Sequence, residues 1–184
     1  GSEMTAEGLR NGDALALQAN SGVALDYDEV NPYVFAEPTS PHIVSADEGR
    51  PIDAARLSNG LRRLELRADW VLVEGAGGWF TPLSAEYTFA DWVRQEQLPV
   101  ILVVGIKLGC INHAVLTAQA VQQAGLKLAG WIANDVAPPG RRHQEYLATL
   151  RRMLPAPLLG EIPHLPQAER APLGQYLDIS LLAQ

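Results

Sequence analysis

The chain has a single cysteine, Cys110, so no internal disulfide can form. The absence of disulfides is typical of a reducing compartment, and we expect the protein in the cytoplasm. No apolar run approaches the roughly 18 residues of a membrane span. No signal-peptide pattern opens the sequence, so neither membrane insertion nor secretion is predicted. A catalytic cysteine needs a histidine and an Asn or Asp arranged around it, and the adjacent Asn112 and His113 do not form that signature.

Positive charge is scarce. The sequence has 14 Lys and Arg against 21 Asp and Glu, which gives a formal net charge of -7. A nucleic-acid surface needs a basic face, so we do not expect nucleic acid as a partner. We interpret the local cluster of Arg141, Arg142, Arg151 and Arg152 as a solvated helix face rather than a phosphate site.

The sequence also lacks a Gly-x-x-x-x-Gly-Lys-Ser/Thr stretch, the P-loop whose backbone N–H groups cradle nucleotide phosphates. What it does have is the composition of a globular protein, with 47% apolar residues in 184. That length predicts one domain able to bury a substantial core.

The most informative segment is residues 70–79. Four apolar residues, 70–73, run directly into Glu74 and then into a turn that contains Gly75, Gly77 and Gly78. A short unbroken apolar run predicts a strand buried on both faces, and open parallel sheets bind ligands outside the carboxyl ends of their strands. Glu74 therefore lies where P-loop enzymes place an acid that holds Mg²⁺. The alternative is an exposed glutamate before a flexible turn.

Apolar runs alternate with helical patterns along the chain. The predicted strands are 70–74, 99–104, 126–133 and 158–162. The predicted helices are 8–20 with Asn11 and Asp13 as capping residues, 40–49, 52–67, 87–96, 112–124 with Asn112 as its cap, 141–153 and 176–183. This alternation predicts an α/β fold, a doubly wound, mostly parallel sheet with helices on both faces. Polar residues or a glycine loop follow three predicted strands, at Glu74, 105–107 and Asn134-Asp135, which suggests a site.

Four segments in this order resemble dethiobiotin synthetase, the ATP-dependent enzyme that closes the ureido ring in biotin biosynthesis. They are Val-Glu-Gly-Ala-Gly-Gly-Trp (73–79), Val-Gly-Ile-Lys-Leu-Gly-Cys-Ile-Asn-His (104–113), Trp-Ile-Ala-Asn-Asp (131–135) and Leu-Gly-Glu-Ile-Pro (159–163). The resemblance extends along the whole chain. It implies a single P-loop-NTPase-like domain over residues 1–184, built as a three-layer sandwich.

The resemblance has one departure, at the start of the chain. Family members open with a strand, a P-loop, a helix and a second strand, a unit of about 40 residues. The resemblance implies that this first βαβ unit is missing here. The catalytic P-loop Lys and Thr and the substrate-facing Lys of the family then have no counterparts, so we expect a chain limited to these residues to be inactive.

By resemblance, the reaction takes 7,8-diaminononanoate, CO2 and MgATP. A carbamate forms on one amine, the γ-phosphoryl group of ATP activates it, and the second amine closes the ring. Asp13 and Glu74 match the family's magnesium ligands, although the residues around Asp13, taken alone, favour a helix N-cap. The resemblance assigns the nucleotide to Glu74, Gly75, Ala76, Gly77, Asn134, Asp135, Pro163, His164, Leu165 and Glu169.

Asn134 matches the amide that reads adenine. The substrate carboxylate is assigned to a loop contributed by the neighbouring subunit of a homodimer, and this loop consists of Leu108, Gly109, Cys110, Ile111 and Asn112. Free N–H groups before a helix suit an anion, although an ordinary strand-to-helix loop is the alternative.

Two other hypotheses stay open at this point. The first is a non-catalytic fragment or regulatory binding module of the same fold. The second is another P-loop relative, such as a cobyrinate synthase-like enzyme or a partitioning ATPase. The Cys-Ile-Asn-His loop and the Trp-Phe-Thr-Pro segment (79–82) fit this second hypothesis less well.

Overall fold

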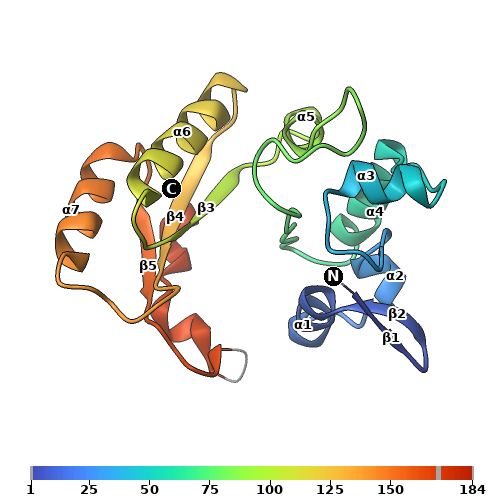
Figure 1. Cartoon of the computed structure of the whole chain (residues 1–184), viewed down its shortest axis with the longest axis horizontal. Helices are drawn as coiled ribbons and strands as arrows, with labels where there is room; N and C mark the ends of the chain where they lie inside the picture. The colour runs from blue at the N-terminus through green and yellow to red at the C-terminus, as the bar shows by residue number, and fades with distance from the viewer. Residues whose placement is uncertain (1, 169–170, 184) are drawn as a thin grey trace. The chain divides into compact units, whose positions relative to one another are not determined.

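The computed structural model describes residues 2–168 and 171–183 (Figure 1). The chain divides into two units, Gly1–Glu96 and Gln97–Gln184, and each is described by itself. The single domain expected from the sequence stays a prediction.

The first unit opens with a β-hairpin. Strands β1 (Ser2–Thr5) and β2 (Gly8–Asn11) pair antiparallel, and Gly8 takes the positive φ of 107° that the turn requires. Helix α1 (Gly12–Asn20) follows directly. The predicted helix 8–20 is therefore right from residue 12 and wrong before it, because pairing with β1 draws residues 8–11 into a strand.

Three further helices of this unit agree with the sequence pattern, and they are α3 (Pro41–Asp47), α4 (Ala54–Glu65) and α5 (Phe89–Gln95). Helix α2 (Tyr27–Val30) was not predicted. Asp53 caps α4 by accepting a hydrogen bond from the Ala55 N–H at 2.8 Å. Thr88 and Asp91 form a capping box at the start of α5. Leu61 and Trp92 are buried on these helices.

The predicted buried strand at 70–74 is wrong. Residues 70–75 have no regular secondary structure, and the side chains of Trp70 and Leu72 are each 65% exposed. A strand forms only where a neighbouring strand supplies hydrogen bonds. Among the described residues of this unit, the strands are β1 and β2, which pair with each other. The apolar pattern of 70–73 is therefore present without the partner that would turn it into a strand.

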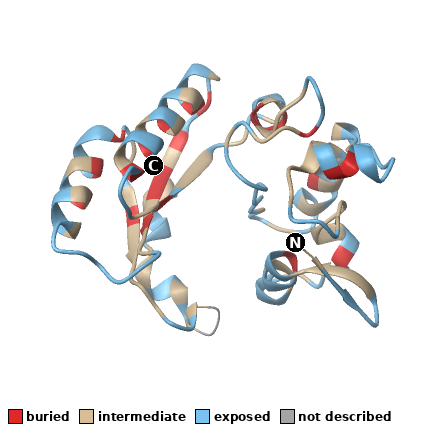
Figure 2. Ribbon diagram, in the orientation of Figure 1, coloured by how far each residue is buried: buried red, intermediate tan, exposed pale blue. Residues whose placement is uncertain are grey.

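The second unit contains a parallel sheet. Strands β3 (Val100–Gly105), β4 (Leu128–Asn134) and β5 (Leu158–Ile162) lie in the order β3-β4-β5. Helices α6 (Cys110–Gln123) and α7 (His143–Met153) make the crossovers, and α6 packs against β3, β4 and α7. Figure 2 shows buried residues gathered along β4, where Trp131 is fully buried. This arrangement is the predicted parallel α/β pattern.

The predicted C-terminal α-helix at 176–183 is replaced by two 3-10 helices, η2 (Leu173–Tyr176) and η3 (Ile179–Ala183). Leu177 forms an isolated bridge with Gly160, and the Asp178 N–H donates to the Leu159 carbonyl oxygen at 2.7 Å. These bonds to β5 hold residues 177–178 extended and so interrupt the helix.

Gly160 is where this segment comes closest to the sheet. A Cβ atom at Gly160 would meet the backbone carbonyl oxygen of Tyr176, which cannot rotate away. We expect Gly160→Ala to lower the free energy of unfolding by about 1–3 kcal/mol, measured by urea denaturation. Gly174→Ala is the matched control, because a Cβ there would meet nothing within 4 Å. Equal stability of the two variants would contradict the prediction.

Candidate active site

In the first unit, the charge of one carboxylate, that of Asp13, acts on a second, that of Glu74. Asp13 lies in the first turn of α1, and Glu74 follows the apolar residues 70–73. Partial burial raises the pKa of the Glu74 carboxyl, and the negative charge of Asp13 raises it further. Neither carboxylate accepts a hydrogen bond from any residue in the described part of the chain. The two oxygen-donor groups are therefore available to a ligand.

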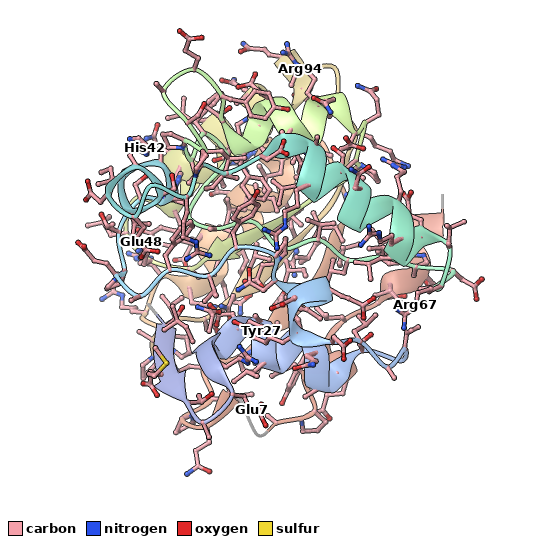
Figure 3. The ribbon with its side chains drawn as sticks, turned by 90° about the vertical axis from the view of Figure 1, so that its right-hand side faces the viewer. Glu7, Tyr27, His42, Glu48, Arg67 and Arg94 are labelled. Carbon is pink, nitrogen blue, oxygen red and sulfur yellow. The ribbon has the colours of Figure 1, made fainter. Side chains whose placement is uncertain are left out.

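The position of Asp13 is set by its neighbours. Asn11 is the N-cap of α1, and its side chain accepts from the Ala14 N–H at 3.1 Å. The hydroxyl of Tyr27, labelled in Figure 3, accepts from the Asn11 N–H at 2.7 Å. Asn11 thus caps the helix as predicted, whereas Asp13 is not a cap and lies one step inside it. This leaves the Asp13 carboxylate free of a capping role.

One glycine after Glu74, Gly77, has a local explanation that the sequence did not reveal. Gly77 adopts φ +74°, and a Cβ there would lie 2.5 Å from the hydroxyl of Thr81. That hydroxyl accepts a hydrogen bond from the Gly78 N–H at 2.8 Å. A Cβ at Gly75 would make only an ordinary contact with the Phe89 ring, at 3.5 Å. The turn itself therefore requires glycine at position 77, and the predicted nucleotide contacts of Gly75, Ala76 and Gly77 stay predictions.

The acid pair is suited to a hard cation that takes further ligands from elsewhere. Within residues 2–168 and 171–183, no group of three or more His, Cys, Asp or Glu side chains could hold a metal ion alone. Mg²⁺ keeps several waters and is commonly bound by one or two carboxylates together with phosphate oxygens. Asp13 and Glu74 fit that pattern and do not form a closed metal site of their own.

The second unit gathers its predicted site residues at the carboxyl edge of the sheet. Gly105, Asn134 and Ile162, the last residues of β3, β4 and β5, lie in register. The Asn134 side-chain amide makes no hydrogen bond to the described residues, so both its donor and its acceptor are available. Residues 163–165 continue from β5 and are half-buried. Glu169 falls outside the described residues.

Asp135 has a partner that sequence reasoning missed. Its Oδ1 lies 2.7 Å from Nε2 of His143, the first residue of α7. The two side chains are only 12% and 14% exposed. Because a carboxylate accepts hydrogen bonds, the imidazole donates through its Nε2–H. Nothing in the sequence signals this pair, since the intervening loop of seven residues sets the contact.

The loop assigned to the substrate carboxylate leads into α6. The helix begins at Cys110 with Gly109 as N-cap, at φ +91°. Asn112 is therefore inside the first turn, and the prediction that it caps this helix is wrong. Gly109 can adopt the left-handed conformation that starts the helix two residues earlier. Leu108 is 89% exposed, whereas Cys110 is buried. The first turn of α6 supplies backbone N–H groups that lack helical partners.

Comparison with known proteins identifies the family. The AAA domain family matches residues 3–171. The chain is also 90% identical to the ATP-dependent dethiobiotin synthetase BioD of Serratia marcescens, over 100% of this chain and 82% of that protein. The chain belongs to the dethiobiotin synthetase family. It is 75% identical to the BioD of Pseudescherichia vulneris, over 99% of this chain and 76% of that protein. It is 72% identical to BioD 1 of Escherichia coli K12, over 99% of this chain and 81% of that protein.

Membership of the dethiobiotin synthetase family confirms the α/β, P-loop-NTPase-like fold class and an ATP-dependent ligase. The match covers the whole of this chain, so it gives no support to the expectation that a first βαβ unit is missing from it. The family is also the one predicted, in preference to a cobyrinate synthase-like enzyme or a partitioning ATPase. None of the described helices has the length and apolar character needed to cross a membrane.

Proposed function

We propose that the enzyme makes dethiobiotin from 7,8-diaminononanoate, CO2 and MgATP; the expectation that a chain limited to these residues is inactive stays a prediction. One amine adds to CO2 and loses a proton, which gives a carbamate. The carbamate oxygen takes the γ-phosphoryl group and ADP leaves; the second amine then attacks the carbamate carbon, and phosphate leaves as the ring closes. The observation that carries the proposal is the 90% identity to a dethiobiotin synthetase over the full chain.

The test is to incubate the enzyme with the diamine, ¹³C-bicarbonate and MgATP and to follow products by mass spectrometry. We expect labelled dethiobiotin with one ADP and one phosphate released for each ring formed. Release of ADP without ring formation would contradict the proposed reaction and favour a non-catalytic or differently acting relative.

We assign Mg²⁺ to Asp13 and Glu74. The support is that both carboxylates lack protein hydrogen-bond donors among the described residues and that the charge of Asp13 raises the pKa of Glu74. Two like charges near each other are stabilised by a cation. Asp13 and Glu74 would hold the Mg²⁺, which would supply positive charge to offset the negative charge that develops during phosphoryl transfer.

We assign the nucleotide to the carboxyl edge of the second unit. Asn134 would pair with adenine, because an amide offers both an acceptor for the exocyclic amine and a donor for a ring nitrogen. Pro163, His164 and Leu165 would frame the nucleoside, and Glu169 would contact the ribose. Gly75, Ala76 and Gly77 would lie along the nucleotide. The free amide at the end of a central strand supports this assignment.

Asn134→Ala is expected to weaken ATP binding by about 1–3 kcal/mol, the cost of leaving buried base groups unpaired. Isothermal titration calorimetry with ATP measures the effect, and the KM for the diamine should change much less. Asn134→Asp is the matched variant, because it keeps the shape and the acceptor but loses the donor. Unchanged ATP affinity in both variants would rule out the adenine assignment.

We assign the substrate carboxylate to residues 108–112, which lead into and open α6, from the opposite subunit of a homodimer. The first N–H groups of a helix suit an anion, and the helix dipole adds to the attraction, although the Cys110 N–H already donates to the Lys107 carbonyl oxygen at 3.0 Å. The exposed Leu108 side chain, in the turn before α6, is an apolar group that a partner subunit would cover.

A further inference from the structure

The hydrogen bond between His143 and Asp135 closes an exposed loop. Asp135 directly follows β4, and His143 opens α7. The intervening residues 136–142 are all exposed. The side chains of the bonded pair, by contrast, are 14% and 12% exposed, with 2.7 Å between Nε2 and Oδ1. A largely desolvated hydrogen bond to a carboxylate is among the stronger ones in a protein. This bond therefore ties α7 to the end of the central strand.

The same turn is held by its backbone. The Asp135 N–H donates to the Ile162 carbonyl oxygen at 2.9 Å, and the Asn134 carbonyl oxygen accepts from the Ile106 N–H at 2.8 Å. Asn134 is thus fixed to both neighbouring strands through the main chain. Beyond Asp135, the Gly140 carbonyl oxygen accepts from the His143 N–H at 3.1 Å, and the His143 imidazole ties this loop back to Asp135. Removal of the His143 imidazole would leave this turn held by the backbone hydrogen bonds of Asn134 and Asp135.

We propose that His143 is a positioning residue for nucleotide recognition, acting through Asp135 to fix the direction of the Asn134 amide. This inference rests on the proposed role of Asn134 in binding adenine. Because its carboxylate is bonded to His143, Asp135 contributes to the nucleotide site by fixing the orientation of the adjacent Asn134. Preorganised groups bind more tightly because less conformational freedom is lost when the ligand arrives.

The expected signature is a loss of base discrimination. ATP and inosine triphosphate share the triphosphate and ribose but differ in the group at position 6 of the base, an amine in ATP and a carbonyl oxygen in inosine triphosphate. A correctly aimed Asn134 amide accepts from that amine, so the wild type should prefer ATP. His143→Ala should weaken ATP roughly tenfold, by analogy with the loss of a hydrogen bond to a charged group. Affinity for inosine triphosphate should change little, so the ATP preference should fall by a similar factor.

His143→Gln is the matched control, since its amide N–H can still donate to Asp135, and it should restore most of the ATP preference. His143→Phe keeps a ring of similar shape without an N–H and provides the same comparison if the alanine variant does not fold. Affinities for both nucleotides are measured by calorimetry at saturating Mg²⁺.

A wild-type ATP preference in His143→Ala or His143→Phe would overturn the inference. So would equal weakening of both nucleotides, which would indicate that the bond only stabilises α7. The Asn134→Ala variant distinguishes a failure of the positioning role of His143 from a failure of the adenine assignment. If Asn134→Ala loses the ATP preference while the His143 variants keep it, the positioning role fails and the adenine assignment stands. If Asn134→Ala also keeps the preference, the adenine assignment itself fails.

Discussion

Glu74→Gln is expected to lower Mg²⁺-dependent dethiobiotin synthesis by about a hundredfold or more, as removal of a transition-state electrostatic contact does elsewhere. The substitution is nearly isosteric and Glu74 lies in an exposed segment without regular secondary structure, so the fold should be retained. The measurement is kcat at saturating diamine and bicarbonate over a Mg²⁺ titration. Glu86→Gln is the matched control, because it neutralises another exposed carboxylate of the same unit. Activity within about twofold of wild type would exclude a metal role for Glu74.

The same variant gives a stability test that does not depend on turnover. Burial and Asp13 raise the pKa of Glu74, so the folded state holds this proton more tightly than the unfolded state does. The ionised carboxylate therefore destabilises the fold. The penalty is complete above the folded pKa and disappears as the pH falls through the folded and then the unfolded pKa.

Without metal at neutral pH, Glu74→Gln should consequently have a Tm equal to or slightly above that of wild type, and the difference should vanish in acid. Added Mg²⁺ should raise the Tm of wild type, because a ligand of the folded state stabilises it, and should raise that of the variant much less. The same Mg²⁺-induced rise in both proteins would place the cation elsewhere.

Sequence patterns predicted those elements whose signals are local. The helices predicted at 52–67 and 87–96 correspond to α4 and α5, because the periodic spacing of apolar residues is a local signal. The strand patterns at 99–104, 126–133 and 158–162 correspond to β3, β4 and β5 because these runs have each other as neighbours. Asn134 was predicted at a strand end, and the register with Gly105 and Ile162 places it there.

The features that were missed depend on partners distant in sequence or on a single backbone angle. Residues 70–74 carry a strand pattern, but a strand requires a paired neighbour as well as apolar side chains. The hydrogen bond of His143 to Asp135 depends on how a seven-residue loop closes, and no spacing rule encodes it. The early start of α6 depends on the left-handed conformation of Gly109, which only the backbone reveals.

The shared site is tested by mixing two variants that are each inactive. Leu108→Glu adds a negative charge where we assign the substrate carboxylate, and like charges repel. Leu108 suits this purpose better than Gly109, because the Leu108 side chain is 89% exposed. Gly109 has φ +91°, a backbone angle that would be strained in a residue with a side chain. Leu108→Gln has the same size without the charge and should retain most of the activity. The second variant is Glu74→Gln.

In a dimer with one chain of each kind, one site combines an intact Glu74 with an intact loop from the other chain, and the second site has both defects. If equal amounts exchange subunits at random, half of the dimers are mixed and each has one working site. The mixture should then recover about a quarter of wild-type activity. Exchange is followed independently by native mass spectrometry of differently tagged chains. If mixed dimers form and activity does not return, each subunit completes its own site, because pairing the variants would then leave every site with one defect.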